Sequence, residues 1–168
     1  NMRPRLERTQ VFGYDRGAAA SARSAVAEML KQFGVPEGGM LRRSGNRGVF
    51  AVLPERMTKK HIREVAKEYG ISLKRLSLVV DSDPEKISDR CWFTGVADPN
   101  NIGTIIFCPK AFASKEMLVR TLFHEKVHVL QFLEHGSEYV QNNRAYFEQL
   151  AYEAENAFIL QMKQEGRL

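Results

Sequence analysis

The segment from residue 118 to residue 135, LVRTLFHEKVHVLQFLEH, constrains this chain more than any other part of it. Read as a helix at about 100° per residue, the segment carries His124, His128 and His135 on one polar face. Leucine, valine and phenylalanine occupy most of the remaining surface, and a helix that is apolar on most sides is a buried helix. Polar side chains on a buried helix indicate either a catalytic or metal-binding site or hydrogen bonds to the rest of the fold.

Residues 124–128 match the pattern H-E-x-x-H, which on a helix places two imidazoles one turn apart with a carboxylate between them. Imidazoles at positions i and i+4 project from the same face and can fill two neighbouring positions of a tetrahedral zinc ion. The pattern therefore predicts a zinc site with His124 and His128 as ligands. The alternative is a pair of hydrogen-bonded histidines on an ordinary amphipathic helix.

A third ligand must come from elsewhere, because a catalytic zinc ion takes three protein ligands and leaves a fourth position for water. His135 lies too far along the helix axis to reach the same ion, so we expect it to support the ligands or to line a substrate cleft. A last helix is predicted over residues 142–163. On that helix Glu148 and Glu155 share one flank of the apolar stripe, whereas Glu153 lies across it. Either of the first two can complete the site.

The pattern H-E-x-x-H followed by a glutamate on the next helix resembles the gluzincin group of zinc metallopeptidases. The sequence LVRTLFHEKVHVLQ, followed later by FEQLAYEAE, is similar to sequences of the small zincin domains of phage head-morphogenesis proteins and of bacterial polymorphic toxins. The resemblance covers roughly residues 91–160. It implies that His124, His128 and Glu148 bind zinc and that Glu125 is the general base.

The resemblance fails at one position, because thermolysin-like enzymes place an acidic residue four positions after the third ligand and this chain has Tyr152 there. Glu155 therefore remains an alternative to Glu148 as the third ligand. In a metallopeptidase mechanism Glu125 takes a proton from the activated water, and the oxyanion needs a further hydrogen-bond donor. We predict Tyr152 in that role. The alternatives are Tyr146, Tyr139, His135 and Arg144.

The chain as a whole predicts an α+β fold of the zincin-like kind, with a small antiparallel or mixed sheet of some four strands packed on the H-E-x-x-H helix and a C-terminal helix. We expect residues 1–16 to form an N-terminal arm and residues 17–168 to form a single domain. Periodicity and capping residues predict helices over 17–33 and 58–69 and after Ser114, a glycine-rich loop over 36–48, and strands over 48–53, 76–81, 91–96 and 104–108.

The two strands before the H-E-x-x-H helix, 91–96 and 104–108, predict an antiparallel hairpin because the link between them, ADPNNIG, is turn-forming. An edge strand beside a metallopeptidase site can pair with an extended peptide. Residues 103–108 are either that edge strand or an internal strand of the sheet.

The chain has a formal net charge of +5, but its lysines and arginines are scattered along the sequence, so a nucleic-acid partner is not expected. The alternative of a nucleic-acid-binding protein rests on this charge and on the arginines at 42–47. No apolar run approaches the roughly 18 residues of a membrane helix, and no signal peptide is seen. We therefore expect a cytoplasmic protein without membrane contact. Cys91 and Cys108 lack C-x-x-C spacing and are expected to be thiols rather than a disulfide.

These features together predict a Zn²⁺-dependent metallopeptidase that acts on a peptide or protein substrate and is associated with a phage, a mobile element or a toxin. The alternative is a non-catalytic zincin-fold module that serves as a binding or structural part of a phage or mobile-element protein.

Overall fold

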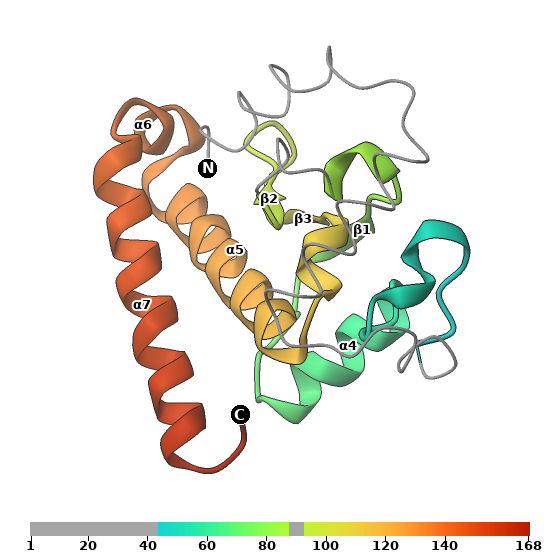
Figure 1. Ribbon diagram of the computed structural model, residues 1–168. Helices are drawn as coiled ribbons and strands as arrows, with labels where there is room; N and C mark the ends of the chain where they lie inside the picture. Colours follow the sequence, from blue (N-terminus) through green and yellow to red (C-terminus); the bar gives the residue numbers. More distant parts are fainter. Residues whose placement is uncertain (1–43, 88–92) are drawn as a thin grey trace.

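The computed structural model of the protein describes residues 44–87 and 93–168, which form an α+β fold (Figure 1). The elements in chain order are η1 (Gly48–Val52), α4 (Lys59–Glu68), β1 (Ser77–Val80), η2 (Pro84–Ile87), β2 (Gly95–Ala97), β3 (Thr104–Phe107), η3 (Pro109–Phe112), α5 (Lys115–His135), α6 (Ser137–Asn142) and α7 (Arg144–Gln164). The predicted arm over 1–16, the helix over 17–33, most of the loop over 36–48 and Cys91 lie outside the described residues.

The described strands form a mixed sheet in the order β1-β3-β2. β1 runs parallel to β3 with Ser77 opposite Thr104, and β2 runs antiparallel to β3 with Val96 opposite Ile106. The predicted hairpin is therefore confirmed. Of the two alternatives for residues 103–108, the internal strand is confirmed and the edge strand is excluded, because β3 lies between the other two strands and β2 is the strand nearer α5.

The prediction of a strand at residues 48–53 is also wrong, because this segment forms the 3-10 helix η1. Its apolar side chains Val49, Phe50 and Val52 gather around Ile87 of η2 instead of pointing to two faces of a sheet. A short apolar run has the same composition in both states, and no described strand lies beside this segment to pair with it. The described sheet therefore has three strands where some four were predicted.

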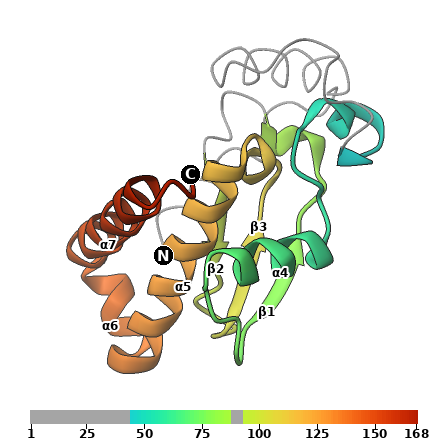
Figure 2. The same cartoon turned by 90° about the horizontal axis from the view of Figure 1, so that it is seen from below.

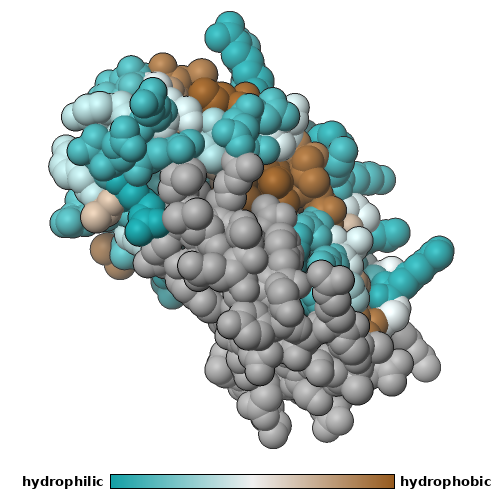
Figure 3. Space-filling model, turned by 90° about the horizontal axis from the view of Figure 1, so that it is seen from above, coloured by the Kyte–Doolittle hydropathy of each residue, from teal (hydrophilic) through white to brown (hydrophobic). Residues whose placement is uncertain are grey.

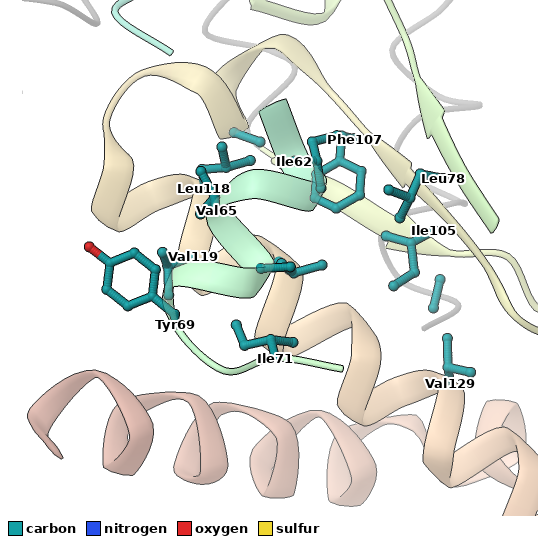
Figure 4. Close-up of a cluster of buried hydrophobic side chains, with 14 of the residues drawn as sticks. Ile62, Val65, Tyr69, Ile71, Leu78, Ile105, Phe107, Leu118, Val119 and Val129 are labelled. Carbon is teal, nitrogen blue, oxygen red and sulfur yellow. The ribbon is translucent and has the colours of Figure 1, made fainter. Parts of the chain in front are cut away.

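Helix α4 covers one face of the sheet and begins where the sequence predicts, since the Thr58 side chain accepts a hydrogen bond from the His61 backbone N–H. Figure 2 shows α4 lying over the strands. Ile62 and Val65 of α4 meet Leu78 and Ile105 of the sheet in the buried core, where Leu118 of α5 also lies (Figure 4). The core therefore sits between α4, the sheet and α5.

Helix α5 begins at Ser114, whose side chain accepts from the Met117 N–H, and ends at Gly136, which has a φ of 84°. The positive φ favours glycine and lets the chain turn into the short helix α6. α7 then returns along α5 in the opposite direction, as Figure 1 shows. This turn brings residues of α7 back against the H-E-x-x-H face of α5.

The described surface is mostly hydrophilic in the view of Figure 3, with separate hydrophobic patches. Among the described helices, none combines the length and apolar composition needed to cross a membrane. Cys108, the N-cap residue of η3, is buried and is present as a thiol.

Candidate metal centre

Three buried side chains from two helices converge at the α5–α7 contact. His124 and His128 come from α5 and Glu148 comes from α7. His124 Nε2 lies 2.6 Å from Glu148 Oε1 and 3.1 Å from His128 Nε2, and His128 Nε2 lies 3.4 Å from the same Glu148 oxygen. The ligand atoms of these residues all lie within 4.8 Å of one another, so the group can hold a metal ion.

The spacing of these atoms fits a small tetrahedral ion. Ligand atoms that each lie about 2.0–2.1 Å from a tetrahedral zinc ion are about 3.3 Å from one another. Two of the observed separations, 3.1 and 3.4 Å, are close to that value, and the third, 2.6 Å, is shorter. The shortest of them joins an imidazole nitrogen to a carboxylate oxygen at the distance of a charge-assisted hydrogen bond.

The second oxygen of Glu148 gives an independent test of the fit. Glu148 Oε2 is buried and has no hydrogen-bond partner among the described residues. Leaving a buried polar atom unsatisfied costs about 1–3 kcal/mol, more when the group is charged. A cation held by the three side chains would remove this cost, so the donor set and its surroundings match a metal site.

The outward nitrogen of each histidine is held by a neighbouring side chain. His124 Nδ1 lies 2.9 Å from Glu155 Oε1, and His128 Nδ1 lies 2.8 Å from Gln131 Oε1. Gln131 Nε2 donates to the Phe147 carbonyl, so its oxygen faces His128 and must accept the Nδ1 proton. This arrangement directs His128 Nε2 at Glu148 and at the metal position, where its lone pair would bind an ion, as in metal-binding histidines generally.

Glu155 is in turn held by Arg120, whose Nη1 donates to Glu155 Oε2 at 2.6 Å. Arg120 also donates through Nε to Glu116, and Glu116 pairs with Lys163 of α7. The structure therefore separates the two candidate glutamates: Glu148 faces the centre, and Glu155 stands behind His124. Arg120 and Gln131 were not predicted as site residues, although both lie on the same helix face as the histidines and that shared face is the signal that could have identified them.

The charges of the metal-free site are coupled. Burial lowers the pKa of His124, but the hydrogen bonds to Glu148 and Glu155 outweigh burial and raise the pKa to about 10. Burial raises the pKa of Glu148, but the hydrogen bonds from His124 and His128 outweigh it and hold the pKa well below its ordinary value. Without a metal ion, the site therefore holds a protonated His124 against an ionised Glu148 at neutral pH.

Glu125 lies on the β2 side of α5 and is buried. Its Oε1 accepts a 3.0 Å hydrogen bond from the Ala97 backbone N–H of β2. The strand comes this close because of Gly95, where an added Cβ would lie 2.7 Å from the Thr121 side chain and 2.9 Å from the Ile106 carbonyl. The H-E-x-x-H carboxylate is thus held against the strand that borders the site, a contact that the sequence reading did not anticipate.

The predicted oxyanion donors lie in different places. The Tyr152 ring packs against the His124 ring with centroids 4.5 Å apart, and Tyr152 is 44% exposed. His135 and Tyr139 instead pack around Phe147 at the far end of α5. Tyr146 also packs on Phe147, and Arg144 begins α7. Of the predicted donors, all of which lie in the described part of the chain, only Tyr152 makes a ring contact with one of the three residues His124, His128 and Glu148.

Comparisons of the chain with models of protein families, with curated proteins and with solved structures found no match. The interpretation of the site therefore depends on the geometry of His124, His128 and Glu148 and on the groups that surround them.

Proposed function

We propose that this protein is a zinc metallopeptidase that hydrolyses peptide bonds. The observation that carries the proposal is the buried group of His124, His128 and Glu148, with the Glu125 carboxylate on the same helix between the two histidines. Two imidazoles and one carboxylate form the ligand set of many hydrolytic zinc sites, in which a fourth position is left to water.

Zinc is the metal that this donor set favours, since two imidazoles suit zinc better than magnesium or calcium, which prefer oxygen ligands. A zinc ion bound here would supply a Lewis acid that polarises a carbonyl and makes water acidic near neutral pH. Glu155 and Gln131 hold the two imidazoles in the orientation that keeps their Nε2 atoms toward the ion.

Glu125 acts as the general base in this proposal. Its carboxylate accepts the proton of the attacking water and returns it to the leaving amine. The Ala97 N–H fixes one oxygen of this carboxylate, and the other oxygen remains for the proton transfer. Tyr152 donates its phenol proton in a hydrogen bond to the oxyanion from its place beside His124.

Strand β2, and not β3, is the strand of the sheet that lies beside Glu125. Thr94 O and Asp98 N bond to the β3 side, so the backbone groups of Gly95 and Ala97 point away from β3 and toward α5. This edge of β2 is covered by α5, because the Ala97 N–H donates to Glu125 and all three residues of β2 are buried.

The test compares wild-type protein with Glu125→Gln and with Glu134→Gln, a matched change at an exposed position of the same helix. We expect one zinc ion per chain in all three proteins when they are purified without added metal and measured by mass spectrometry. Cleavage of an unfolded protein substrate should persist in wild type and Glu134→Gln and disappear in Glu125→Gln. Wild-type cleavage by Glu125→Gln would contradict the proposed mechanism.

The association with a phage, a mobile element or a toxin rests on the resemblance of the α5 and α7 sequences to the small zincin domains of such proteins. A non-catalytic zincin-fold module gives a different result in the same experiment. It would bind zinc in all three proteins and cleave the substrate in none of them.

A further inference from the structure

A small pocket lies between α4 and the edge of the sheet. Figure 2 shows that α4 and β1 lie on the side of α5 away from α7. Its volume is about 280 Å³. Sites for small organic ligands usually span about 300–1,000 Å³, so this pocket fits one or two side chains better than a whole cofactor. The lining residues are Lys59, Arg63, Leu73, Leu76, Ser77 and Leu78.

Two exposed cations form one wall of the pocket. Lys59 and Arg63 stand one turn apart on the same flank of α4, beside the face that is buried through Ile62 and Val65. Within residues 44–87 and 93–168 neither cation forms an ion pair, in contrast to Lys115, which pairs with Glu68. These two cations, which no described carboxylate neutralises, lie beside the leucine side chains that line the pocket. The combination favours a ligand that is both acidic and apolar.

The other wall is the outer edge of β1. Ser77 N–H donates to Gly103 O and Asp81 N–H donates to Phe107 O, so alternate residues of β1 face β3. The backbone groups of Leu78 and Val80 therefore point away from β3, and no described residue forms a hydrogen bond with them. An open edge of this kind is a template for pairing with another extended chain.

We propose that the β1 edge and this pocket bind an extended acidic peptide as an added strand. The peptide pairs with the backbone of Leu78 and Val80, places a carboxylate between Lys59 and Arg63, and lays an apolar side chain on Leu73. Phosphate alone or nucleic acid would use the two cations but would leave the strand edge unused. This site goes beyond the proposed peptidase activity and does not depend on it.

The experiment uses the full chain carrying Glu125→Gln, so that no cleavage affects the measurement. The probe is a fluorescein-labelled peptide of eight residues that alternates glutamate and valine, and its binding is followed by fluorescence anisotropy. Lys59→Glu combined with Arg63→Glu should weaken binding at least about tenfold. Lys60→Glu combined with Lys67→Glu makes the same change in net charge on α4 outside the pocket, and should change binding less than twofold.

A second measurement reports the strand pairing directly. Amide hydrogen exchange of Leu78 and Val80 should slow when the peptide binds, because both amides point to the open edge and enter the new ladder. The proposal would be overturned if the two charge-reversal pairs weakened binding equally, or if a control peptide that alternates lysine and valine bound as tightly as the probe. It would also be overturned by full competition from inorganic phosphate, or by unchanged amide exchange at Leu78 and Val80. Because none of these outcomes involves metal or cleavage, they leave the proposed peptidase function to its own test.

Discussion

Glu148 and Glu155 lie on the same flank of α7 but meet different nitrogens of His124. Glu148 approaches Nε2, where His128 also points, whereas Glu155 approaches Nδ1 and is held by Arg120. The two carboxylates therefore differ in function although they are the same residue type with similar burial. One can bind the metal directly, and the other can only orient a ligand.

Helical periodicity predicted the shared flank but not this division, and only the resemblance to gluzincins favoured Glu148 as the ligand. Helical periodicity fixes the angle of a residue around α7, and Glu148 and Glu155 differ little in angle. They differ by two turns along the axis, roughly 10 Å. Which turn of α7 faces His124 depends on how the helix docks on α5 after the turn at Gly136, and no local sequence pattern encodes that.

Replacing each glutamate by alanine should separate the two roles. We expect Glu155→Ala to weaken zinc binding about 10–100-fold, the usual effect of losing a residue that orients a histidine ligand. Glu148→Ala removes a ligand and should weaken binding further. Competition with a fluorescent zinc chelator measures both affinities, and a larger loss in Glu155→Ala than in Glu148→Ala would reverse the assignment.

At the scale of elements, α4, α5 and α7 were predictable because local signals mark them. Thr58 and Ser114 cap their helices through hydrogen bonds that need only neighbouring residues, and Gly136 ends α5 with a positive φ. The sheet order was not predictable in this way. β1 pairs in parallel with β3, which is not the next strand along the described chain, so β3 becomes internal through a long-range contact.

The contact between β2 and α5 depends on the absence of a side chain at residue 95. A methyl group there would meet the Thr121 Cγ2 atom and the Ile106 carbonyl oxygen at less than 3.0 Å, and the carbonyl belongs to the sheet backbone. Gly95→Ala should therefore destabilise the protein by about 1–3 kcal/mol, as overpacking of a buried position does. It should also displace the Ala97 N–H from Glu125 and reduce any peptidase activity.

Urea unfolding of Gly95→Ala measures the loss of stability. Adding Thr121→Ser removes the methyl group in the closer contact and keeps a hydroxyl, which bonds to the Met117 carbonyl in the wild type. The double variant should recover part of the stability, but not all of it, because the contact with Ile106 remains. Wild-type stability in Gly95→Ala would show that β2 and α5 can separate at no cost.

At the scale of the whole molecule, the metal group joins α7 to the part of the protein that contains the sheet. Its ligands come from α5, which packs on the sheet, and from α7, which packs on α5. A metal ion that binds only the folded chain therefore stabilises this connection, by about 4 kcal/mol when its free concentration is 1,000 times the Kd.

Removing the metal with a chelator should lower the urea midpoint of the wild-type protein, and adding zinc should restore it. His128→Ala loses a ligand and should no longer respond to zinc. His135→Ala is the matched control, since it changes a histidine of the same helix outside the metal group, and it should respond as wild type does. A wild-type protein whose midpoint ignores both chelator and zinc would contradict a metal centre.

Zinc binding should depend on pH because the metal competes with a proton on His124. The folded-state pKa of about 10 lies above the ordinary value of 6.5, so the proton stabilises the metal-free fold fully below pH 6.5, and this stabilisation is lost as the pH rises through 10. Zinc must displace that proton, so its apparent affinity should rise about tenfold per pH unit from neutral pH toward pH 10. Chelator competition at several pH values, corrected for the chelator's own protonation, measures this slope.

The Glu155→Gln variant makes the pH prediction specific to the site. The Glu155 carboxylate is one of the two hydrogen-bond partners that raise the pKa of His124. Without its charge the proton leaves His124 at lower pH, so the rise in zinc affinity should level off at lower pH than in the wild type. A zinc affinity that is flat above neutral pH in the wild type would mean that His124 is already neutral there and that its pairing with Glu148 is weaker than the geometry indicates.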